Sequence, residues 1–204
     1  MTELTLISPA MGKPPQSEQG ISTRISEGAW RPPGKPVVIT ATLIDLLREK
    51  FHLDWNGIHG VAHWARVRSN GLTLARRNGA NPRVVEYFAF LHDVCRRNDG
   101  RDRSHGSRAA AFAEQIRDRH LVLDNGEFFV LVAAIDGHTH GKSHEDLTVQ
   151  TCWDADRLDL GRVGIEPLPE RLSTPEAKDP SVIAGACESA RLWLRQYRDG
   201  GGSR

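Results

Sequence analysis

The sequence has little of what a membrane protein, a secreted protein or a thiolate metal site requires. None of its apolar runs approaches the roughly 20 residues of a membrane-spanning helix. Its first residues, MTELTLISPAMGKPPQ, lack the basic and apolar segments of a secretory signal peptide. The cysteines Cys95, Cys152 and Cys187 are widely spaced and contain no CxxC pair, which argues against a disulfide framework and a thiolate zinc site. We therefore expect a cytoplasmic protein in a reducing compartment.

An excess of charge of one sign is also absent. The sequence contains 27 Lys and Arg residues against 26 Asp and Glu residues, and its formal net charge is +1. Such a balance gives no general attraction to nucleic acid or to an anionic membrane. We expect neither as a partner, and an anionic substrate must be attracted by basic side chains close to the site.

The first part of the sequence is poor in apolar side chains and rich in proline. Its prolines are Pro9, Pro14, Pro15, Pro32, Pro33 and Pro36. Such a composition does not supply a hydrophobic core. We expect residues 1–36 to form a flexible or loosely docked arm. Residues 37–199 are then long enough for one helical domain.

Helical periodicity runs through this domain, and no strand-like alternation persists. The first helix is expected to start near Thr40, with Thr40 or Thr42 as its N-cap, and to place Leu43, Leu46 and Leu47 on one face. Further helices are predicted at 57–77, from Pro82 through Cys95, and at 104–120, 125–137 and 147–160. A last helix should begin near Pro180, end before Gly200 and bury Val182, Ile183, Ala186, Leu192 and Leu194. The predicted fold class is all-α.

Histidines concentrate on or at the ends of these helices. Six of the nine do so, namely His59, His63, His92, His105, His138 and His140. His92 and Asp93 lie within the apolar stretch VVEYFAFLHDVC, which we expect to be helical throughout. A buried ionisable pair in such a stretch must be hydrogen-bonded, charge-paired or bound to a metal ion, because an uncompensated buried carboxylate is too costly.

The partners of this pair must come from other helices, because adjacent helical residues diverge by about 100°. His63, in GIHGVAHWARV, and an aspartate of CWDADRLDL are suitable, since each interrupts a largely apolar helix. Two imidazoles and two carboxylates suit Mn²⁺, Fe²⁺, Co²⁺, Ni²⁺, Zn²⁺ or Mg²⁺. His59 and His63 have the spacing of the HExxH zinc motif, but Gly60 replaces its glutamate, so this is no zincin.

These residues resemble the HD-domain superfamily of metal-dependent phosphohydrolases, whose signature is a His, a His-Asp doublet and a distant Asp. The matching residues are His63, His92, Asp93 and Asp156. HWARV resembles the usual HxxRV, FLHDVC resembles the surroundings of the doublet, and DADRLD resembles the last-ligand helix of one bacterial branch. The resemblance covers residues 38–164 and implies a compact HD-type bundle of about six to seven helices.

The last ligand has two candidates, Asp156 and Asp154. Many family members carry it in an Ala-Asp-basic-Leu pattern, and this sequence has that pattern at Ala155–Leu158. The resemblance therefore favours Asp156. Asp154 is the alternative, and the two cannot both face one ion because they lie about 200° apart around a helix.

The resemblance implies one divalent metal ion and leaves open a second, with His105 and His138 as its ligands. Asp93 would orient or deprotonate a water that the metal activates. His105 stands at a helix start, where a phosphate oxygen is also favoured, so it could instead be a general acid. His138 could equally cap a helix, and we interpret His59 and His140 as structural.

Arg96, one turn beyond His92, and Arg66 are predicted to bind the substrate phosphate. The predicted function is hydrolysis of a phosphate ester, of a nucleotide or of another small phosphoester. One alternative is a catalytically silent HD module that binds a nucleotide or a partner. Another is a di-iron oxygenase, which would need both His105 and His138 at the metal. The segment 162–178, rich in proline and charge, is expected to be a loop near the site that acts as a lid.

Overall fold

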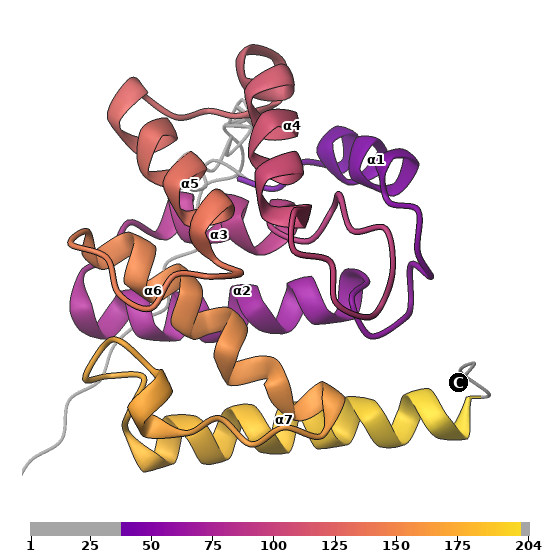
Figure 1. Ribbon diagram of the computed structural model, residues 1–204, viewed down its shortest axis with the longest axis vertical. Coiled ribbons are helices and arrows are strands. Elements are labelled where there is room, and N and C mark those ends of the chain that lie inside the picture. Colours follow the sequence, from indigo (N-terminus) through magenta and orange to yellow (C-terminus); the bar gives the residue numbers. More distant parts are fainter. Residues whose placement is uncertain (1–37, 201–204) are drawn as a thin grey trace, which may run out of the picture. The chain divides into compact units, whose positions relative to one another are not determined.

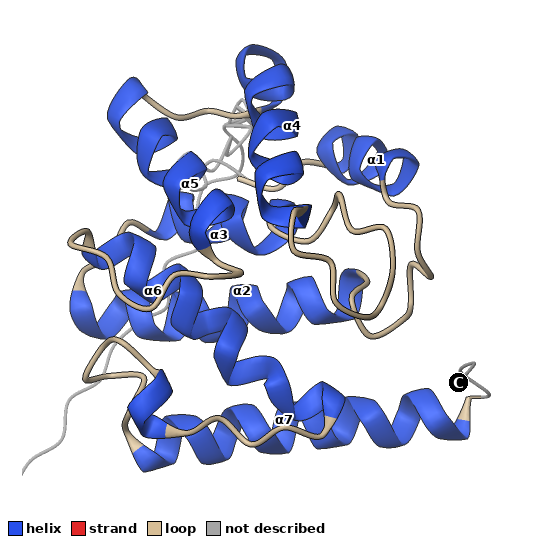
Figure 2. Cartoon of the chain, viewed as in Figure 1, coloured by secondary structure: helices blue, strands red, loops and turns tan. Residues whose placement is uncertain are grey.

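The computed structural model describes residues 38–200, and the predicted arm at residues 1–36 lies outside this range. The described chain forms seven α-helices and two short 3₁₀ helices, with no strand between residues 38 and 200 (Figure 1). Figure 2 shows these helices joined by loops and turns, among them an extended loop between α3 and α4. The all-α class predicted from the sequence is confirmed. None of the helices within residues 38–200 is both long and apolar enough to cross a membrane.

The elements follow one another in a simple order. The first four helices are α1 (Ala41–Lys50), α2 (Val61–Asn78), α3 (Pro82–Leu91) and α4 (His105–His120). They are followed by α5 (Asn125–Gly137), α6 (Leu147–Arg157), the 3₁₀ helices η1 (Leu158–Val163) and η2 (Pro169–Arg171), and α7 (Pro180–Asp199).

Several helices start where a side chain caps the free backbone N–H groups. Thr40 accepts a hydrogen bond from the N–H of Leu43 at 3.2 Å, as the sequence predicted. Asn81 caps α3, in which Pro82 occupies the first turn. Asp124 and Glu127 form a reciprocal capping box at the start of α5. These local signals explain why the helix starts near residues 41, 82 and 125 were predictable.

The core is organised around α2, which packs against α3 and α6, while α5 packs against α3, α4 and α6 (Figure 1). Completely buried core side chains include Leu43, Leu47, Trp64, Val67, Phe88, Leu91, Leu131 and Ile135. α7 packs against η1 and α2 over a second, smaller cluster that contains Leu74, Leu158 and Leu172. This packing brings the start of α2, the end of α3, the start of α4, the end of α5 and the end of α6 to one place.

α2 starts later than predicted, at Val61 instead of residue 57, because residues 54–60 form turns. The backbone of Gly60 passes so close to Trp55 that a Cβ atom at residue 60 would lie 2.0 Å from the Trp55 carbonyl oxygen. The turn therefore requires glycine at this position. It leads directly into the helix that carries His63.

Two further predictions were wrong. His92 and Asp93 do not lie within a helix, because α3 ends at Leu91 and residues 92–95 form turns. The N–H of Val94 bonds to the Leu91 carbonyl and that of Arg96 to the Asp93 carbonyl, three residues back each time. The sequence has no proline or glycine to mark this end.

In α7, Leu192 is 48% exposed instead of buried, because the helix packs mainly through Ala186, Cys187 and Ala190. Val182, Ile183 and Leu194 are half-buried.

Candidate metal centre

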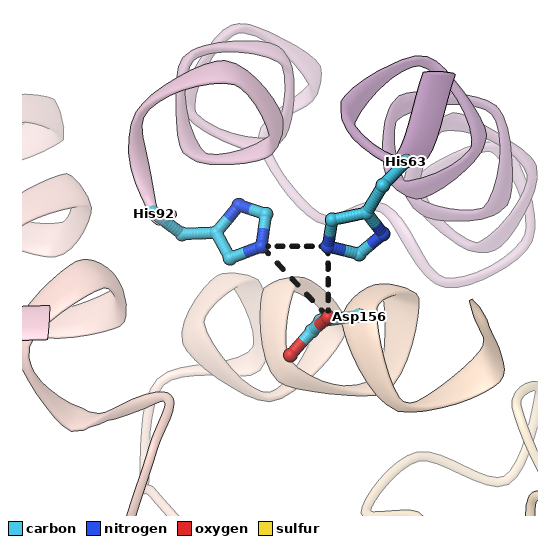
Figure 3. A group of neighbouring side chains, drawn as sticks. All are labelled: His63, His92 and Asp156. Carbon is cyan, nitrogen blue, oxygen red and sulfur yellow. Dashed lines mark hydrogen bonds and ion pairs between the residues drawn. The ribbon is translucent and has the colours of Figure 1, made fainter. Parts of the chain in front are cut away.

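Three side chains from three helices meet in one group of potential metal ligands (Figure 3). His63 belongs to α2, His92 follows the last residue of α3, and Asp156 lies near the end of α6. The two Nε2 atoms are 3.2 Å apart. Oδ1 of Asp156 lies 3.5 Å from Nε2 of His63 and 3.8 Å from Nε2 of His92. One ion at the centre of these three atoms could contact all of them.

A second group consists of Asp93, His105 and His138. His105 is the first residue of α4, and His138 follows the last residue of α5. Their Nε2 atoms are 2.7 Å apart. Oδ1 of Asp93 lies 3.0 Å from Nε2 of His105 and 3.7 Å from Nε2 of His138.

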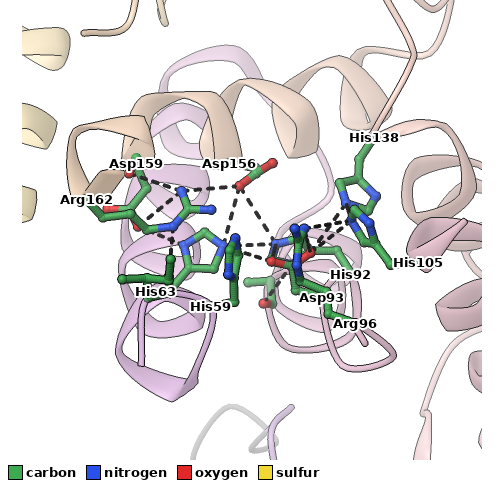
Figure 4. A network of polar contacts seen from close by, with 12 residues as sticks. His59, His63, His92, Asp93, Arg96, His105, His138, Asp156, Asp159 and Arg162 are labelled. Atoms are coloured by element: carbon green, nitrogen blue, oxygen red, sulfur yellow. Dashed lines mark hydrogen bonds and ion pairs between the residues drawn. The ribbon is translucent and has the colours of Figure 1, made fainter. Parts of the chain in front are cut away.

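The carboxylate of Asp93 connects the two groups (Figure 4). Its Oδ1 faces His105 and His138, whereas its Oδ2 lies 3.7 Å from Nε2 of His63 and 3.8 Å from Nε2 of His92. One oxygen thus serves each group. The Asp93 carboxylate could therefore contribute one oxygen to each group of potential ligands.

All four histidines use Nδ1 for a hydrogen bond and turn Nε2 toward the centre. Nδ1 of His92 bonds to the carbonyl oxygens of Phe88 and Ala89, and that of His63 to the Asp159 carboxylate. Nδ1 of His105 and of His138 bond to the carbonyl oxygens of Asp102 and Ile135. A neutral ring with its proton on Nδ1 presents a lone pair at Nε2, so the close Nε2 pair of His63 and His92 contains two facing acceptors.

This chemistry fits a divalent cation. Facing acceptors repel one another, and a cation between them removes the repulsion. Oδ1 of Asp156 gives independent support, because it is buried and has no hydrogen-bond partner within residues 38–200. Buried polar atoms are nearly always satisfied, and an orphaned carboxylate oxygen facing two imidazoles is expected where a metal ion binds.

The protonation states agree with this assignment. Burial lowers the pKa of His92 to about 4 and holds the pKa of His63 well below its usual value, so both rings are neutral at pH 7. Burial alone would raise the pKa of Asp93, but His92, the hydrogen bonds from His105 and His138, and Arg96 hold it well below the usual range. Neutral imidazoles and an ionised carboxylate are the forms that bind metal.

Behind His63 lies a buried ion pair that the sequence analysis did not identify. Oδ2 of Asp159 lies 2.7 Å from Nδ1 of His63. Arg66 donates from Nε to Oδ1 of Asp159 at 2.6 Å and from a terminal nitrogen to Oδ2 at 3.0 Å. Its guanidinium also lies over the ring of Trp193, 4.5 Å from the ring centroid. Arg66, which was predicted to bind the substrate phosphate, thus has two of its three nitrogens bonded to Asp159.

Arg162 is a second buried cation that was not predicted. It donates to the carbonyl oxygens of Ile58 and Asp159, and it lies 4.0 Å from Oδ1 of Asp156. A signal for Asp159 existed in its spacing, because it follows Asp156 by three residues and so lies on the same side of a helical segment. Arg162 follows Asp159 by another three residues, so the same spacing indicated its side as well.

Asp154, the alternative last ligand, lies away from the histidines. Its carboxylate accepts hydrogen bonds from the N–H of Ser173 at 2.8 Å and from the N–H and the hydroxyl of Thr174 at 2.7 and 2.8 Å. Asp154 therefore anchors the segment that was expected to form a lid.

Arg96 lies beside Asp93, as its predicted role requires. A terminal nitrogen is 3.3 Å from Oδ1 of Asp93, and the other donates to the carbonyl oxygen of Gly100 at 2.8 Å. It forms part of the wall of a cavity of about 640 Å³, which we call the arginine cavity. The cavity is lined by Arg96, Gly100, Arg101, Asp102, Arg103, His105, Thr139 and His140.

The two remaining histidines of the predicted set lie at the margin. His59 is buried, and its Nδ1 lies 3.0 Å from the carboxylate of Asp99. His140 is exposed, donates from Nε2 to the carbonyl oxygen of Arg103 at 3.0 Å and lines the arginine cavity. Neither belongs to the two ligand groups.

Comparison with known proteins gives one informative match. No protein-family model matches the sequence, and no curated protein matches it. A crystal structure of a predicted HD superfamily hydrolase from an uncultured Thermotogales bacterium is similar, with a TM-score of 0.57 and 23% sequence identity. The match covers 80% of this chain and 94% of that one. The helices that carry the two ligand groups are therefore arranged in the HD-domain fold, as the sequence signature implied.

Proposed function

We propose that this chain is a metal-dependent phosphohydrolase that cleaves a phosphate ester of a small molecule. The observation that carries the proposal is the convergence of six ligand side chains next to the arginine cavity. The ligands supply a place for divalent cations, and the cavity supplies guanidinium groups for phosphate. The HD-domain fold is consistent with hydrolase activity, although the similar solved protein is itself named only as a predicted hydrolase.

Each ligand group would hold one ion. His63, His92, Asp156 and Oδ2 of Asp93 would form one site, and His105, His138 and Oδ1 of Asp93 the other. A divalent metal bound there would polarise a phosphoryl oxygen and lower the pKa of a water. The mixed nitrogen and oxygen set suits Mn²⁺, Fe²⁺, Co²⁺, Ni²⁺, Zn²⁺ or Mg²⁺.

Asp93 and Arg96 have distinct tasks in this proposal. The Asp93 carboxylate stays ionised at neutral pH, so it can orient the attacking water and accept a hydrogen bond from it. Arg96 has its guanidinium beside Asp93 and in the cavity wall, where it can bind a phosphoryl oxygen and stabilise the charge that develops there.

His105 fits a ligand role better than a general-acid role. Its Nδ1 bonds to the carbonyl oxygen of Asp102 at 2.5 Å, which turns Nε2 toward the second ligand group. Nε2 also faces His138 and Asp93 instead of open space. We therefore assign His105 and His138 to the second ion.

The test is turnover by the purified chain of a panel of phosphoesters with Mn²⁺, Co²⁺, Ni²⁺ or Mg²⁺, measured as released inorganic phosphate. The Asp93→Ala variant should lose activity by about 10³-fold or more, because one change removes a ligand of both ions and the water-orienting group. Asp118→Ala, which removes an exposed carboxylate of α4, is the matched control and should retain activity. Full activity in Asp93→Ala would overturn the proposal.

The second ligand group also supports a different candidate, a di-iron oxygenase, because both His105 and His138 lie at Asp93. Metal analysis separates the two: two redox-active irons per chain would favour the oxygenase, and two non-redox ions would exclude it. A catalytically silent module would instead show thermal stabilisation by ligands without turnover under any metal.

A further inference from the structure

The arginine cavity contains more positive charge than one phosphoryl group needs. Arg96, Arg101 and Arg103 line it, together with one carboxylate, Asp102. That carboxylate is occupied elsewhere, because its Oδ2 accepts from the N–H of Arg97 at 2.9 Å and from Arg108 at 2.5 Å. Asp102 therefore neutralises Arg108 and leaves Arg101 and Arg103 without a carboxylate of their own in the described part of the chain.

The three cavity arginines differ in how they are held. Arg96 is buried and bonded to Asp93 and Gly100, so it belongs to the part of the cavity next to the metal ligands. Arg101 and Arg103 are exposed, and within residues 38–200 no carboxylate pairs with either side chain. Free guanidinium groups in a cavity are suited to bidentate binding of a phosphate or carboxylate. A substrate phosphate beside Arg96 would leave these two available for a second anionic group.

The cavity offers little apolar surface for a nucleobase, and its only rings within residues 38–200 are the imidazoles of His105, which we assign to the second ion, and of His140. Its lining contains no tryptophan, tyrosine, phenylalanine or aliphatic side chain among the described residues. Trp64 and Trp153, which are close to the ligands in the sequence, are 0% and 3% exposed and belong to the core. Nucleotide and other aromatic ligands are bound largely through apolar and aromatic contacts, and this lining provides few of them.

We infer that the substrate is a small, non-aromatic molecule with two phosphate groups, of which one is cleaved at the metal centre and the other is bound by Arg101 and Arg103. This inference rests on the proposed function for the reaction itself. The binding of the second phosphate depends only on the arginines of the cavity. The two can therefore be tested separately.

The probes are α,ω-alkanediol bisphosphates with short chains and the alkyl monophosphates of the same chain lengths, so each pair differs only in the second phosphate. Adenosine 5′-monophosphate represents the nucleotides. Turnover is measured as phosphate release, and affinity is measured by calorimetry with Mg²⁺ present. The wild-type chain should prefer the best bisphosphate over its monophosphate by about tenfold or more, the value of one charge-assisted contact.

The variant Arg101→Gln/Arg103→Gln removes both charges and keeps polar side chains of similar reach. It should lose the preference for bisphosphates, because the turnover and affinity for bisphosphates should fall about tenfold further than those for monophosphates. Arg97→Gln is the matched control, because Arg97 is exposed in the same loop but does not line the cavity. It should retain the preference. Both side chains of the double variant are exposed, and circular dichroism will verify its fold.

Equal handling of bisphosphates and monophosphates by the wild type would overturn the inference, as would an unchanged preference in the double variant or a preference for the nucleotide. These results leave the proposed function intact if phosphate is released. No turnover of any probe would instead contradict the proposed function. The calorimetric comparison then decides the inference: tighter bisphosphate binding that is lost in the double variant supports it, and its absence refutes it.

Discussion

The Nδ1 atom of His63 and the Oδ2 atom of Asp159 lie 2.7 Å apart, and both side chains are completely buried. The contact fixes the ring so that Nε2 points at His92 and Asp156. Arg66 binds the same carboxylate through two nitrogens, and this balances its charge. Orientation of a ligand histidine by a carboxylate behind it is a common feature of metal sites, and it increases the basicity of the ligand nitrogen.

Asp159→Asn should therefore weaken metal binding without removing a ligand. We expect the affinity for a divalent ion to fall by about 10- to 100-fold, since the amide cannot supply the negative charge. Titration calorimetry with Mn²⁺ or Zn²⁺ measures it, and no substrate is needed. Asp118→Asn makes the same chemical change on the surface of α4 and should have no effect. Unchanged affinity in Asp159→Asn would show that the contact does not tune the centre.

Replacement of Asp156 by alanine should affect metal affinity, whereas replacement of Asp154 should affect stability. Asp156→Ala removes a proposed ligand whose Oδ1 has no hydrogen-bond partner within residues 38–200, so metal affinity should collapse while the metal-free fold is kept. Asp154→Ala leaves the N–H groups of Ser173 and Thr174 without their acceptor, so unfolding free energy should fall by about 1–3 kcal/mol. Calorimetry and urea unfolding measure the two quantities. Retained metal binding in Asp156→Ala would exclude it as a ligand.

The stability of the metal-free protein should depend on pH with a maximum near pH 6.5. Burial lowers the pKa of His63 and lowers that of His92 to about 4, so the unfolded chain binds more protons than the native chain below 6.5. Unfolding free energy should therefore fall as the pH falls from 6.5 toward 4. Burial lowers the pKa of His138, but Asp93 outweighs this effect and raises it. His138 therefore binds more protons in the native chain than in the unfolded chain above 6.5, so the unfolding free energy falls as the pH rises through its native pKa.

Urea unfolding in the presence of a chelator, repeated across this pH range, checks the profile. His52→Gln, a change at an exposed histidine, should leave it unaltered. A constant unfolding free energy between pH 6.5 and 5 would contradict the expectation.

Gly60 and Gly185 should respond in opposite directions to alanine. A Cβ atom at residue 60 would lie 2.0 Å from the Trp55 carbonyl oxygen, and we expect Gly60→Ala to cost about 1–3 kcal/mol or more. A Cβ atom at residue 185 would meet nothing within 4 Å in the exposed middle of α7, so Gly185→Ala should stabilise by about 0.5–1 kcal/mol. Thermal unfolding of the two variants measures both. Equal melting temperatures would contradict the tight turn before α2.

A helix could be predicted from the sequence where residues close to it in the chain mark its start or its buried face. Caps such as Thr40 and Asp124 and the repeating apolar positions determine where helices form, so most helices were predicted near their observed positions. The end of α3 was missed because no proline or glycine marks it, and the turn at His92 depends on packing between helices. The burial of Leu192 was mispredicted because α7 packs through small residues, which a pattern of large apolar side chains does not reveal.

In the candidate site, too, the ligand residues could be predicted from local patterns, whereas contacts between distant residues could not. The spacing of His63, His92 and Asp93 and the pattern around Asp156 could be compared with a known signature. Arg66 was interpreted as a phosphate ligand because a sequence shows that a charge is present but not what it faces. Its partner, Asp159, is 93 residues away, and only the fold brings them together.

The last helix contributes to this arrangement from a distance. The ring of Trp193 covers the guanidinium that binds Asp159, and it keeps water from one side of that charge pair. Solvent weakens an exposed pair of charges much more than a covered one. α7 therefore supplies none of the six proposed ligands, but its Trp193 covers the ion pair of Arg66 and Asp159 that orients His63. The candidate metal centre thus depends on a residue as far along the chain as 193.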